Sequence, residues 1–324
     1  MARCFAVALL AVTACGFAGG RSETVTAVEP IARLSAGPLP FALQFRGERS
    51  DRALITTTAL PGESFEIEAE GSGPGARFEA TAERGELRRL GPGRWRFTAP
   101  DAPGTHLCVD VSQQPSGATA CLQVLVMLPY LGEEFVNGYR IGRYRRMPLP
   151  GHPAYARPRG LVEVTPENRD LPVSPHFRLG EFLAKQKADW PRYLVLRTRL
   201  LLLLETLLDE LRESGIPSTS LVLMSAYRSP FYSASIGNQT VFSRHAYGDA
   251  VDLFVDADGD GRMDDLDGDG AIGAGDARWL YDLLDGLENE AIPAHFAGGL
   301  SVYGPKPHRG PFVHVDTRGR RARW

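Results

Sequence analysis

Two histidines and one aspartate in the C-terminal part of the chain could together hold a metal ion. His245 is followed by Asp252 seven positions later, and His314 stands in the short apolar segment 312–316. Two histidines and a carboxylate can give zinc three protein ligands and leave a fourth position for water, which is the arrangement that hydrolysis requires. Taken singly, each residue has an ordinary alternative: His245 as a surface loop residue, Asp252 as a strand-end ion pair and His314 as a hydrogen-bonded core histidine.

These residues stand in a pattern that is more specific than any one of them. Residues 243–252 read Ser-x-His-x-x-Gly-x-Ala-x-Asp, and the last histidine begins the sequence His314-Val315-Asp316. The pattern resembles that of the zinc D-alanyl-D-alanine carboxypeptidases and related murein endopeptidases, which share the hedgehog/DD-peptidase fold. The resemblance covers residues 175–324 and fits the family's smaller peptidoglycan-directed branch. It implies a zinc metallopeptidase that hydrolyses amide bonds in peptidoglycan stem peptides or cross-links, with His245, Asp252 and His314 as zinc ligands.

Arg228 belongs to a further motif of that family, here Tyr227-Arg228-Ser229-Pro230. The resemblance implies that this arginine faces the peptide carboxylate or carbonyl of the substrate. A guanidinium group can bind a carboxylate through two parallel hydrogen bonds and can stabilise a developing oxyanion. The alternative is a structural ion pair with one of the nearby acids.

The residue that handles protons is where the sequence departs from the family pattern. Many relatives carry Glu or Asp three residues before the last metal histidine, and this position is Pro311 here. His308, on the preceding loop, and Asp316 are the two candidates for the general base. The strand pattern favours Asp316 as the residue that orients His314, because alternate side chains of a strand point the same way. Since a protein can retain zinc without hydrolysis, the alternative function is a catalytically weak module that binds peptidoglycan without cleaving it.

Two overlapping aspartate-rich loops follow the second zinc ligand. Counted from Asp256 or from Asp265, the acids recur at the spacing of an EF-hand calcium loop, with glycine at the sixth position. Carboxylates at this density would repel one another without a cation. We therefore predict structural Ca²⁺ in an insertion at 256–276. The predicted ligands are Asp256, Asp258, Asp260, Asp264, Asp265, Asp267, Asp269 and Asp276. The alternatives are a solvated acidic turn or, for the whole protein, a calcium-stabilised structural component of the envelope.

The first residues have the composition of an export signal. Arg3 precedes a short apolar run and small residues, which predicts a signal peptide at 1–18. The tetrad Val12-Thr13-Ala14-Cys15 resembles a bacterial lipobox, which would place a lipid anchor on Cys15; ordinary cleavage near Ala18 is the alternative. We therefore expect an exported protein of the periplasm or cell envelope, with a membrane-anchored lipoprotein as one form of it.

Two cysteines remain beyond the export signal. Cys108 and Cys121 lie in alternating apolar segments that are separated by a turn-like sequence, so we expect a hairpin in which they stand opposite each other. Opposed residues of an antiparallel pair are close enough to bridge, and an exported protein meets an oxidising environment. The pattern predicts a disulfide rather than two free thiols.

Length and periodicity predict the overall organisation. The 324 residues suffice for about two domains, and 36 Lys+Arg against 39 Asp+Glu gives no general attraction to nucleic acid. Short alternating segments predict an all-β immunoglobulin-like sandwich at 22–128, followed by a connector at 129–172. A helix at 194–214 and a shorter one at 177–183 belong to the predicted zinc domain at 173–324. The expected fold class is α+β, and the expected form is a monomer.

Overall fold

The computed structural model describes residues 37–324 except 72–74, 146–151, 218–219, 239, 241 and 291–296. These described residues all belong to one compact unit. The predicted signal peptide and Cys15 lie outside the described residues. Within the described part of the chain, none of the helices has the length and apolar character needed to cross a bilayer.

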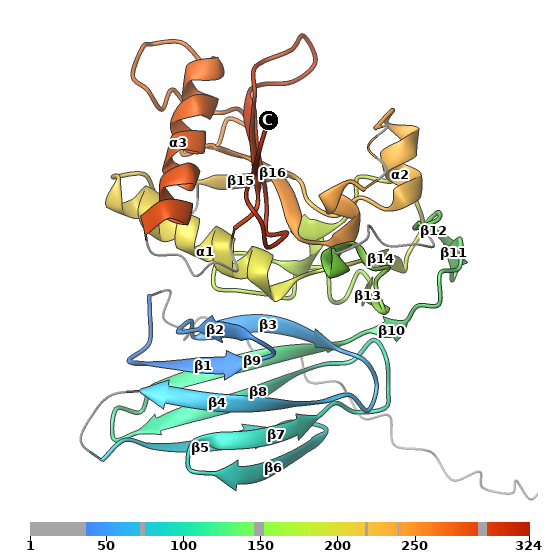
Figure 1. Ribbon diagram of the computed structural model, residues 1–324, viewed down its shortest axis with the longest axis vertical. Helices are drawn as coiled ribbons and strands as arrows, with labels where there is room; N and C mark the ends of the chain where they lie inside the picture. The colour runs from blue at the N-terminus through green and yellow to red at the C-terminus, as the bar shows by residue number, and fades with distance from the viewer. Residues whose placement is uncertain are drawn as a thin grey trace, which may run out of the picture. The chain divides into compact units, whose positions relative to one another are not determined.

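The N-terminal part is a sandwich of two β-sheets (Figure 1). One sheet has the strand order β2-β1-β4-β7-β6 and the other has the order β3-β9-β8-β5, with β3 and β9 parallel. Side chains alternate between buried and exposed along β4, as expected for a strand with one face on a core. The strands are β1 (Phe41–Phe45), β2 (Glu48–Ser50), β3 (Leu54–Ala59), β4 (Ser64–Gly71), β5 (Arg77–Ala82), β6 (Glu86–Gly91), β7 (Arg94–Thr98), β8 (His106–Gln114) and β9 (Thr119–Val126).

The predicted hairpin is formed by β8 and β9, and a disulfide joins its two cysteines. Cys108 and Cys121 are bonded, with their Cα atoms 5.4 Å apart. The expected register was wrong by two residues, since Cys108 lies opposite Gln123 and Cys121 lies opposite Asp110. The bridge is therefore diagonal across the pair, because side chains two positions apart share one face of a strand.

Short strands follow the sandwich. β10 (Leu128–Pro129), β13 (Gly160–Val164) and β14 (Arg192–Leu194) form a three-stranded sheet, and β11 (Phe135–Val136) pairs with β12 (Tyr139–Arg140). The predicted connector at 129–172 thus contributes β13 and part of β10 to this sheet. The third strand, β14, lies beyond the expected end of the connector. The expected shorter helix is only the single 3₁₀ turn η2 (Leu179–Phe182). A second 3₁₀ turn, η1, spans Pro153–Tyr155.

The long leucine-rich helix is α1 (Thr198–Glu213). It begins later than predicted because Leu194 belongs to β14, where it pairs with Val162. All of its leucines are buried, and α1 contacts β2 and β3 of the sandwich. Glu205 is also fully buried in this helix, where its carboxylate accepts hydrogen bonds from Ser174 and from the backbone of His176. These bonds satisfy a charge that would otherwise be costly to bury.

The C-terminal part contains the sheet that carries the predicted zinc ligands. Its strand order is β15-β16-β18-β17-β19, and all neighbours are antiparallel except β17 and β19. Helix α3 packs on β17 and β18 through buried residues spaced three or four apart, namely Ala277, Leu280, Leu284 and Leu287. The elements are β15 (Leu221–Ser225), α2 (Pro230–Ser235), η3 (Arg244–Tyr247), β16 (Ala250–Val255), α3 (Ala274–Glu290), β17 (Gly299–Tyr303), β18 (Phe312–Asp316) and β19 (Ala322–Arg323).

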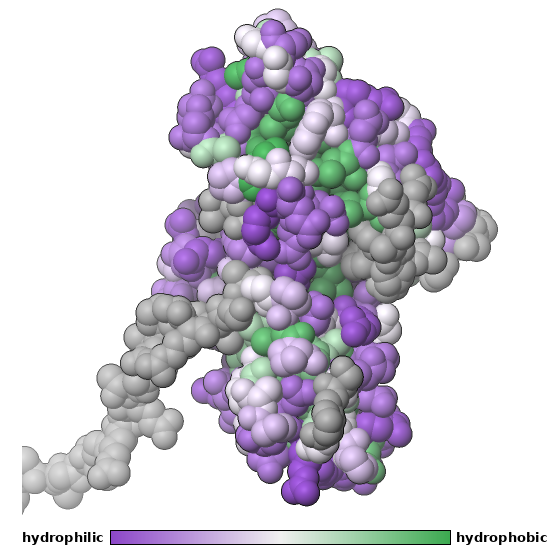
Figure 2. Space-filling model, turned by 90° about the vertical axis from the view of Figure 1, so that its left-hand side faces the viewer, coloured by the Kyte–Doolittle hydropathy of each residue, from purple (hydrophilic) through white to green (hydrophobic). Residues whose placement is uncertain are grey.

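The described residues on the face in Figure 2 form no extended apolar region. Hydrophilic residues dominate this face, and hydrophobic residues show in smaller groups between them. The most exposed large apolar side chains of the described residues include Leu131 and Phe135 in the β10–β12 region and Ile236 after α2. Such scattered exposure is ordinary for a folded protein.

Candidate metal centre

The three predicted zinc ligands meet at one point beside the C-terminal sheet. Asp252 of β16 and His314 of β18 are directly paired across the sheet. The Asp252 Oδ1 atom lies 2.9 Å from His314 Nδ1 and 3.2 Å from His245 Nε2. The two histidine nitrogens are 3.2 Å apart. All three residues are buried, so the side chains form a compact triangle of potential ligand atoms.

This triangle has dimensions that suit a tetrahedral metal. Zinc bonds to nitrogen and oxygen of about 2.0–2.2 Å place neighbouring ligand atoms of a tetrahedron about 3.3 Å apart. The observed separations of 2.9–3.2 Å fall close to that value. Two imidazole nitrogens and a carboxylate also form a donor set that zinc favours. The residues present therefore fit a zinc ion with three protein ligands and one open position.

Local backbone geometry explains the position of His245. Its Nδ1 atom donates to the Ala226 carbonyl oxygen at 2.7 Å, which leaves the Nε2 lone pair directed at the other two ligands. The turn η3 ends at Gly248, whose φ of +73° is in the left-handed region. A Cβ atom at Gly248 would lie 2.2 Å from the Val195 carbonyl oxygen. The glycine of the His-x-x-Gly motif is therefore required both by conformation and by space.

Asp316 contacts His314, the last of the three predicted ligands. Its Oδ2 atom lies 3.3 Å from His314 Nε2, on the opposite side of the ring from the triangle. The same carboxylate accepts hydrogen bonds from the Gly299 amide and from the Arg318 guanidinium. These contacts fix the ring of His314 and direct its Nδ1 atom at Asp252.

Burial and the neighbouring charges shift the pKa values of all three residues. Burial would raise the pKa of the Asp252 carboxyl, but His245 and His314 together hold this pKa well below its ordinary value. Burial lowers the pKa of His245 and so favours its neutral form, which can bind a metal. Burial also acts to lower the pKa of His314, yet Asp252 and Asp316 raise it overall. An anionic carboxylate beside two imidazoles attracts positive charge.

An open pocket of about 560 Å³ leads to the triangle. Its walls are rich in aromatic side chains. Tyr303 and Phe312 face each other across β17 and β18 and stack with ring centroids 4.6 Å apart. The ring of Trp324 lies 5.4 Å from that of His314. Tyr155 and Phe242 also line the pocket and pack edge to face.

These aromatic walls were not predicted from the sequence. Tyr303 and Phe312 flank a Gly- and Pro-containing loop, so a correct pairing of the two segments could have placed them together. Tyr155 lies far from the metal ligands in sequence, in the short turn η1, and carries no local signal. Its position depends on the tertiary structure alone.

Arg228 lies at the centre but makes the ion pair that was the alternative to substrate binding. Its guanidinium group bonds to the carboxylate of Asp252, and its Nε atom donates to Ser225 Oγ at 2.7 Å. It also lines the pocket. The pair with Asp252 occupies the carboxylate oxygen that the histidines do not face. Arg228 can therefore orient the Asp252 carboxylate while it remains within reach of the pocket.

One candidate for the general base does not line the pocket. His308 is exposed, in a turn closed by hydrogen bonds between Lys306 and Arg309. Among the described residues that line the pocket, Asp252 provides the carboxylate, and no second acid is present. No acidic residue in the described pocket lining therefore replaces the acid that the family carries at the position of Pro311.

The two aspartate-rich loops repeat one hydrogen-bond pattern. The Asp256 carboxylate accepts bonds from the amides of Gly259 and Gly261 at 2.7 and 2.9 Å. Asp265 accepts two corresponding bonds in the second loop, each of 2.8 Å, from Gly268 and Gly270. Carboxylate oxygens come within 4.8 Å of one another in two sets, which are Asp256, Asp258 and Asp260, and Asp265, Asp267 and Asp269.

The remaining predicted calcium ligands tie the loops to the fold. Asp264 accepts a hydrogen bond from the Ala257 amide at 2.7 Å. Asp276 is fully buried at the start of α3 and accepts bonds of 2.7 Å from the amides of Leu266 and Gly273. The loops begin at the end of β16, about 13 Å along the strand from Asp252 at about 3.3 Å per residue. The two predicted metal centres therefore have separate ligands.

Comparison with known proteins identifies no family. The chain matches no protein-family model and no curated protein sequence. A solved structure described as "Structure of the S-layer protein SbsC, domains 5-6" is similar at 9% sequence identity, with 88% of each chain covered and a TM-score of 0.19. This similarity is too weak to assign a fold or a function.

Proposed function

We propose that this protein is a zinc metallopeptidase that cleaves amide bonds in the peptide part of peptidoglycan. The observation that supports it most is the triangle of His245, Asp252 and His314 at the base of an open pocket. A structural zinc site is usually closed by four protein ligands, whereas a catalytic site keeps one position open. The sequence resemblance to the hedgehog/DD-peptidase family supports the same reaction and the same fold for the C-terminal part.

The protein residues have distinct roles in the proposed reaction. Zinc held by the triangle would act as a Lewis acid on the scissile carbonyl and would supply an activated water. Asp316 holds His314 in the tautomer and orientation that direct Nδ1 inward. Arg228 orients Asp252 and can turn toward a carboxylate or oxyanion of the substrate. His308 remains our proposed proton acceptor, and this role requires its loop to approach the pocket when substrate binds.

The pocket also suits an extended peptide. Aromatic and arginine side chains offer apolar surface for alkyl groups and cationic hydrogen-bond donors for carboxylates. Stem peptides and their cross-links present both kinds of group. Such a substrate would be met in the periplasm or cell envelope, which agrees with the export signal and the lipobox-like Cys15 that we predict.

Defined muropeptides test the proposal and the type of bond. The zinc-loaded full chain is incubated with a stem pentapeptide that ends in D-alanyl-D-alanine and, separately, with a cross-linked dimer. Mass spectrometry detects either the loss of D-alanine or the conversion of dimer to monomers. We expect one of these products with the wild type and none with Asp252→Ala. If neither substrate is converted although zinc is bound, the peptidase proposal is wrong.

A second candidate is a zinc-dependent binding module that does not cleave peptidoglycan. The favouring observation is the absence of a second carboxylate among the described residues of the pocket, together with Pro311 at the usual position of the acid. Such a module would sediment with purified peptidoglycan in the presence of zinc and would release no fragments. Arg228→Ala would then weaken binding without any effect on products.

We also propose that the loops at 256–276 bind structural calcium. The matched hydrogen bonds of Asp256 and Asp265 hold the backbone in two equivalent turns, each with clustered carboxylates. Carboxylate oxygen is the ligand that calcium prefers, and six to eight oxygens are normally needed. Water or backbone carbonyl groups would complete the coordination, because the twelfth position is aspartate in both counts.

A further inference from the structure

Tyr303 carries a hydroxyl group close to the predicted zinc ligands. Its strand, β17, pairs with β18 so that Ser301 lies opposite His314 and Tyr303 lies opposite Phe312. Directly paired residues lie on the same face of a sheet, and so do alternate residues of one strand. The side chain of Tyr303 is therefore on the face of the sheet that carries His314, and both residues line the metal pocket.

The ring and the hydroxyl group of Tyr303 are both held in place. The ring stacks on that of Phe312, with the two planes 8° from parallel, and the Arg309 guanidinium lies 5.8 Å from its centroid. The hydroxyl oxygen accepts a hydrogen bond of 3.2 Å from Trp324 Nε1. An indole nitrogen only donates, so this bond does not use the hydroxyl proton. No described residue accepts that proton, which leaves it available to a bound molecule.

Trp324 connects this hydroxyl group to the predicted metal centre. Its ring lies 5.4 Å from the ring of His314, and the Arg318 guanidinium lies 5.2 Å from it. The Trp324 carbonyl oxygen accepts a hydrogen bond of 2.6 Å from Ser301 Oγ. These contacts set the direction of the indole N–H although the residue is 57% exposed. The Tyr303 hydroxyl is thus held one side chain away from a predicted zinc ligand.

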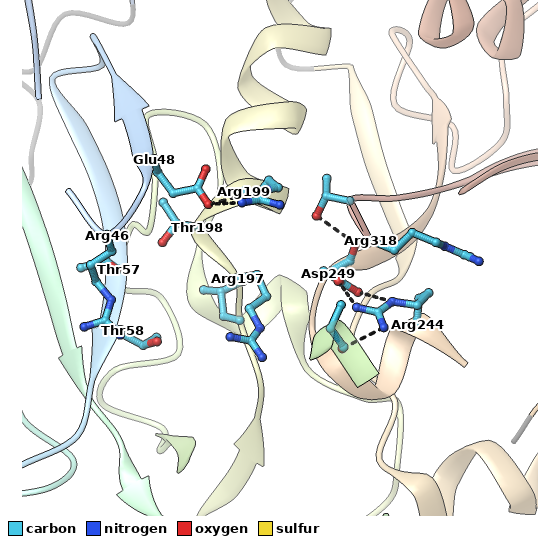
Figure 3. Close-up of a pocket in the computed structure, with 13 residues that line it drawn as sticks. Arg46, Glu48, Thr57, Thr58, Arg197, Thr198, Arg199, Arg244, Asp249 and Arg318 are labelled. Carbon is cyan, nitrogen blue, oxygen red and sulfur yellow. Dashed lines mark hydrogen bonds and ion pairs between the residues drawn. The ribbon is translucent and has the colours of Figure 1, made fainter. Parts of the chain in front are cut away.

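The arginines of the metal pocket, by contrast, are already paired with carboxylates. The pairs are Arg228 with Asp252, Arg244 with Asp249, and Arg318 with Asp316. Figure 3 shows Arg244 with Asp249, in a neighbouring pocket that shares Arg244 and Arg318 with the metal pocket. An arginine of the metal pocket must therefore weaken an ion pair before it can bind a negatively charged oxygen. The hydroxyl group of Tyr303 can donate its proton without such a loss.

We propose that the Tyr303 hydroxyl donates a hydrogen bond to the oxygen of the scissile carbonyl, and that Trp324 is the positioning residue for this hydroxyl. The inference rests on the proposed peptidase function. When water attacks the carbonyl carbon, a C–O bond forms, the π electron pair of the carbonyl moves onto its oxygen, and the water proton goes to the general base. A donor aimed at that oxygen stabilises the transition state more than the ground state. Tyr303 keeps its own proton throughout.

Steady-state kinetics of Tyr303→Phe, with the muropeptide that the wild type cleaves, test this role. Phenylalanine keeps the stacked ring and removes only the hydroxyl group. We expect kcat to fall about 10- to 100-fold, the scale of a hydrogen bond to a charged group, with KM and zinc content unchanged. Tyr281→Phe makes the same exchange on α3, outside the pocket lining, and should turn over as the wild type does.

A double variant tests the role of Trp324. Trp324→Phe keeps an aromatic ring beside His314 and removes the indole donor, so it should also lower kcat. Because the indole acts through the hydroxyl group, the double variant Tyr303→Phe, Trp324→Phe should be no slower than Tyr303→Phe alone. Two losses that multiply in the double variant would contradict the positioning role.

Binding of a phosphinate analogue gives a measurement that does not depend on turnover. In this analogue a tetrahedral, negatively charged phosphinate replaces the scissile amide of the muropeptide. By calorimetry, zinc-loaded Tyr303→Phe should bind it about tenfold or more weakly than the wild type. Equal affinities, or an equal kcat of wild type and Tyr303→Phe, would overturn the role of Tyr303 and leave the peptidase proposal standing. A zinc-loaded wild type that forms no product would contradict the proposed function, and this inference with it.

Discussion

His245, Asp252 and His314 come together for separate local reasons. Strand pairing sets Asp252 opposite His314, while Gly248 closes the turn that brings His245 to the same point. Arg228 and Asp316 then fix the carboxylate and one imidazole by hydrogen bonds. Because each ligand has its own support, removal of one should leave the fold intact and the metal affinity reduced.

Loss of one imidazole should abolish stoichiometric zinc binding. We expect the wild type to retain one zinc per chain after dialysis, and His314→Ala to retain much less because two ligands cannot complete the site. His106→Ala changes a partly exposed histidine of the sandwich and is the matched control. Elemental analysis measures both. Full zinc content in His314→Ala would show that the metal is held elsewhere.

Asp316→Asn should weaken zinc binding without removing it. The amide keeps the size of the side chain but loses the charge that faces His314 Nε2. Loss of such a partner reduces metal affinity roughly 10- to 100-fold. Competition with a chelator of known affinity measures the change, and circular dichroism checks the fold. An unchanged affinity would mean that the orientation of His314 does not depend on Asp316.

His308→Ala should reduce turnover and not zinc content. His308 is exposed and outside the pocket lining, so its removal should not disturb folding or metal binding. If it accepts the proton during hydrolysis, turnover should fall roughly 100-fold or more. Lys306→Ala, in the same turn, is the control. Equal turnover in wild type and His308→Ala would exclude this role and leave Asp316 as the remaining candidate.

The motifs in the sequence predicted that His245, Asp252 and His314 would lie together, but they did not predict the surroundings of Arg228. The pairing of Asp252 with His314 follows from two apolar strands with polar residues at matching positions. Whether Arg228 meets a substrate or an acid depends on its distance from Asp252, and only the tertiary structure sets this distance. The aromatic walls of the pocket also depend on the tertiary structure, because Tyr155 and Trp324 come from distant segments of the chain.

At the scale of elements, sequence periodicity predicted strands and helices better than their ends. The leucine spacing indicates α1, but Leu194 joins β14 because Val162 offers a strand partner. Segment 177–183 has an apolar pattern too short for more than the single turn of η2. The prediction of the β8–β9 hairpin was correct for its strands and its disulfide but wrong for its register. The length of the turn, and not the apolar pattern alone, fixes the register of a hairpin.

Calcium should stabilise the protein through the loops at 256–276. A ligand that binds only the folded state raises its stability by mass action, by about 2.7 kcal/mol at a hundredfold excess over Kd. We expect a higher melting temperature in millimolar calcium, measured by calorimetry with magnesium as the control. The double variant Asp256→Asn, Asp265→Asn should lose this effect. An equal shift with magnesium, or none with calcium, would indicate a solvated acidic loop.

At the scale of the whole molecule, the described sandwich and the C-terminal sheet belong to one compact unit. Helix α1 contacts β2 and β3 of the sandwich, and the ion pair of Arg199 with Glu48 joins α1 to β2. The sequence predicted both parts from their patterns. The sequence could not predict which surfaces of the two parts meet. A helix such as α1 is apolar on most faces, so its pattern does not say which strands it packs against.

The most direct test of the account measures turnover of purified peptidoglycan against zinc occupancy in one preparation. The metal-free full chain is reloaded with increasing zinc, and mass spectrometry counts the new peptide termini released from the polymer. The account predicts no release without zinc and a rise in proportion to occupancy up to one zinc per chain. A fully loaded protein that releases no new termini would contradict it.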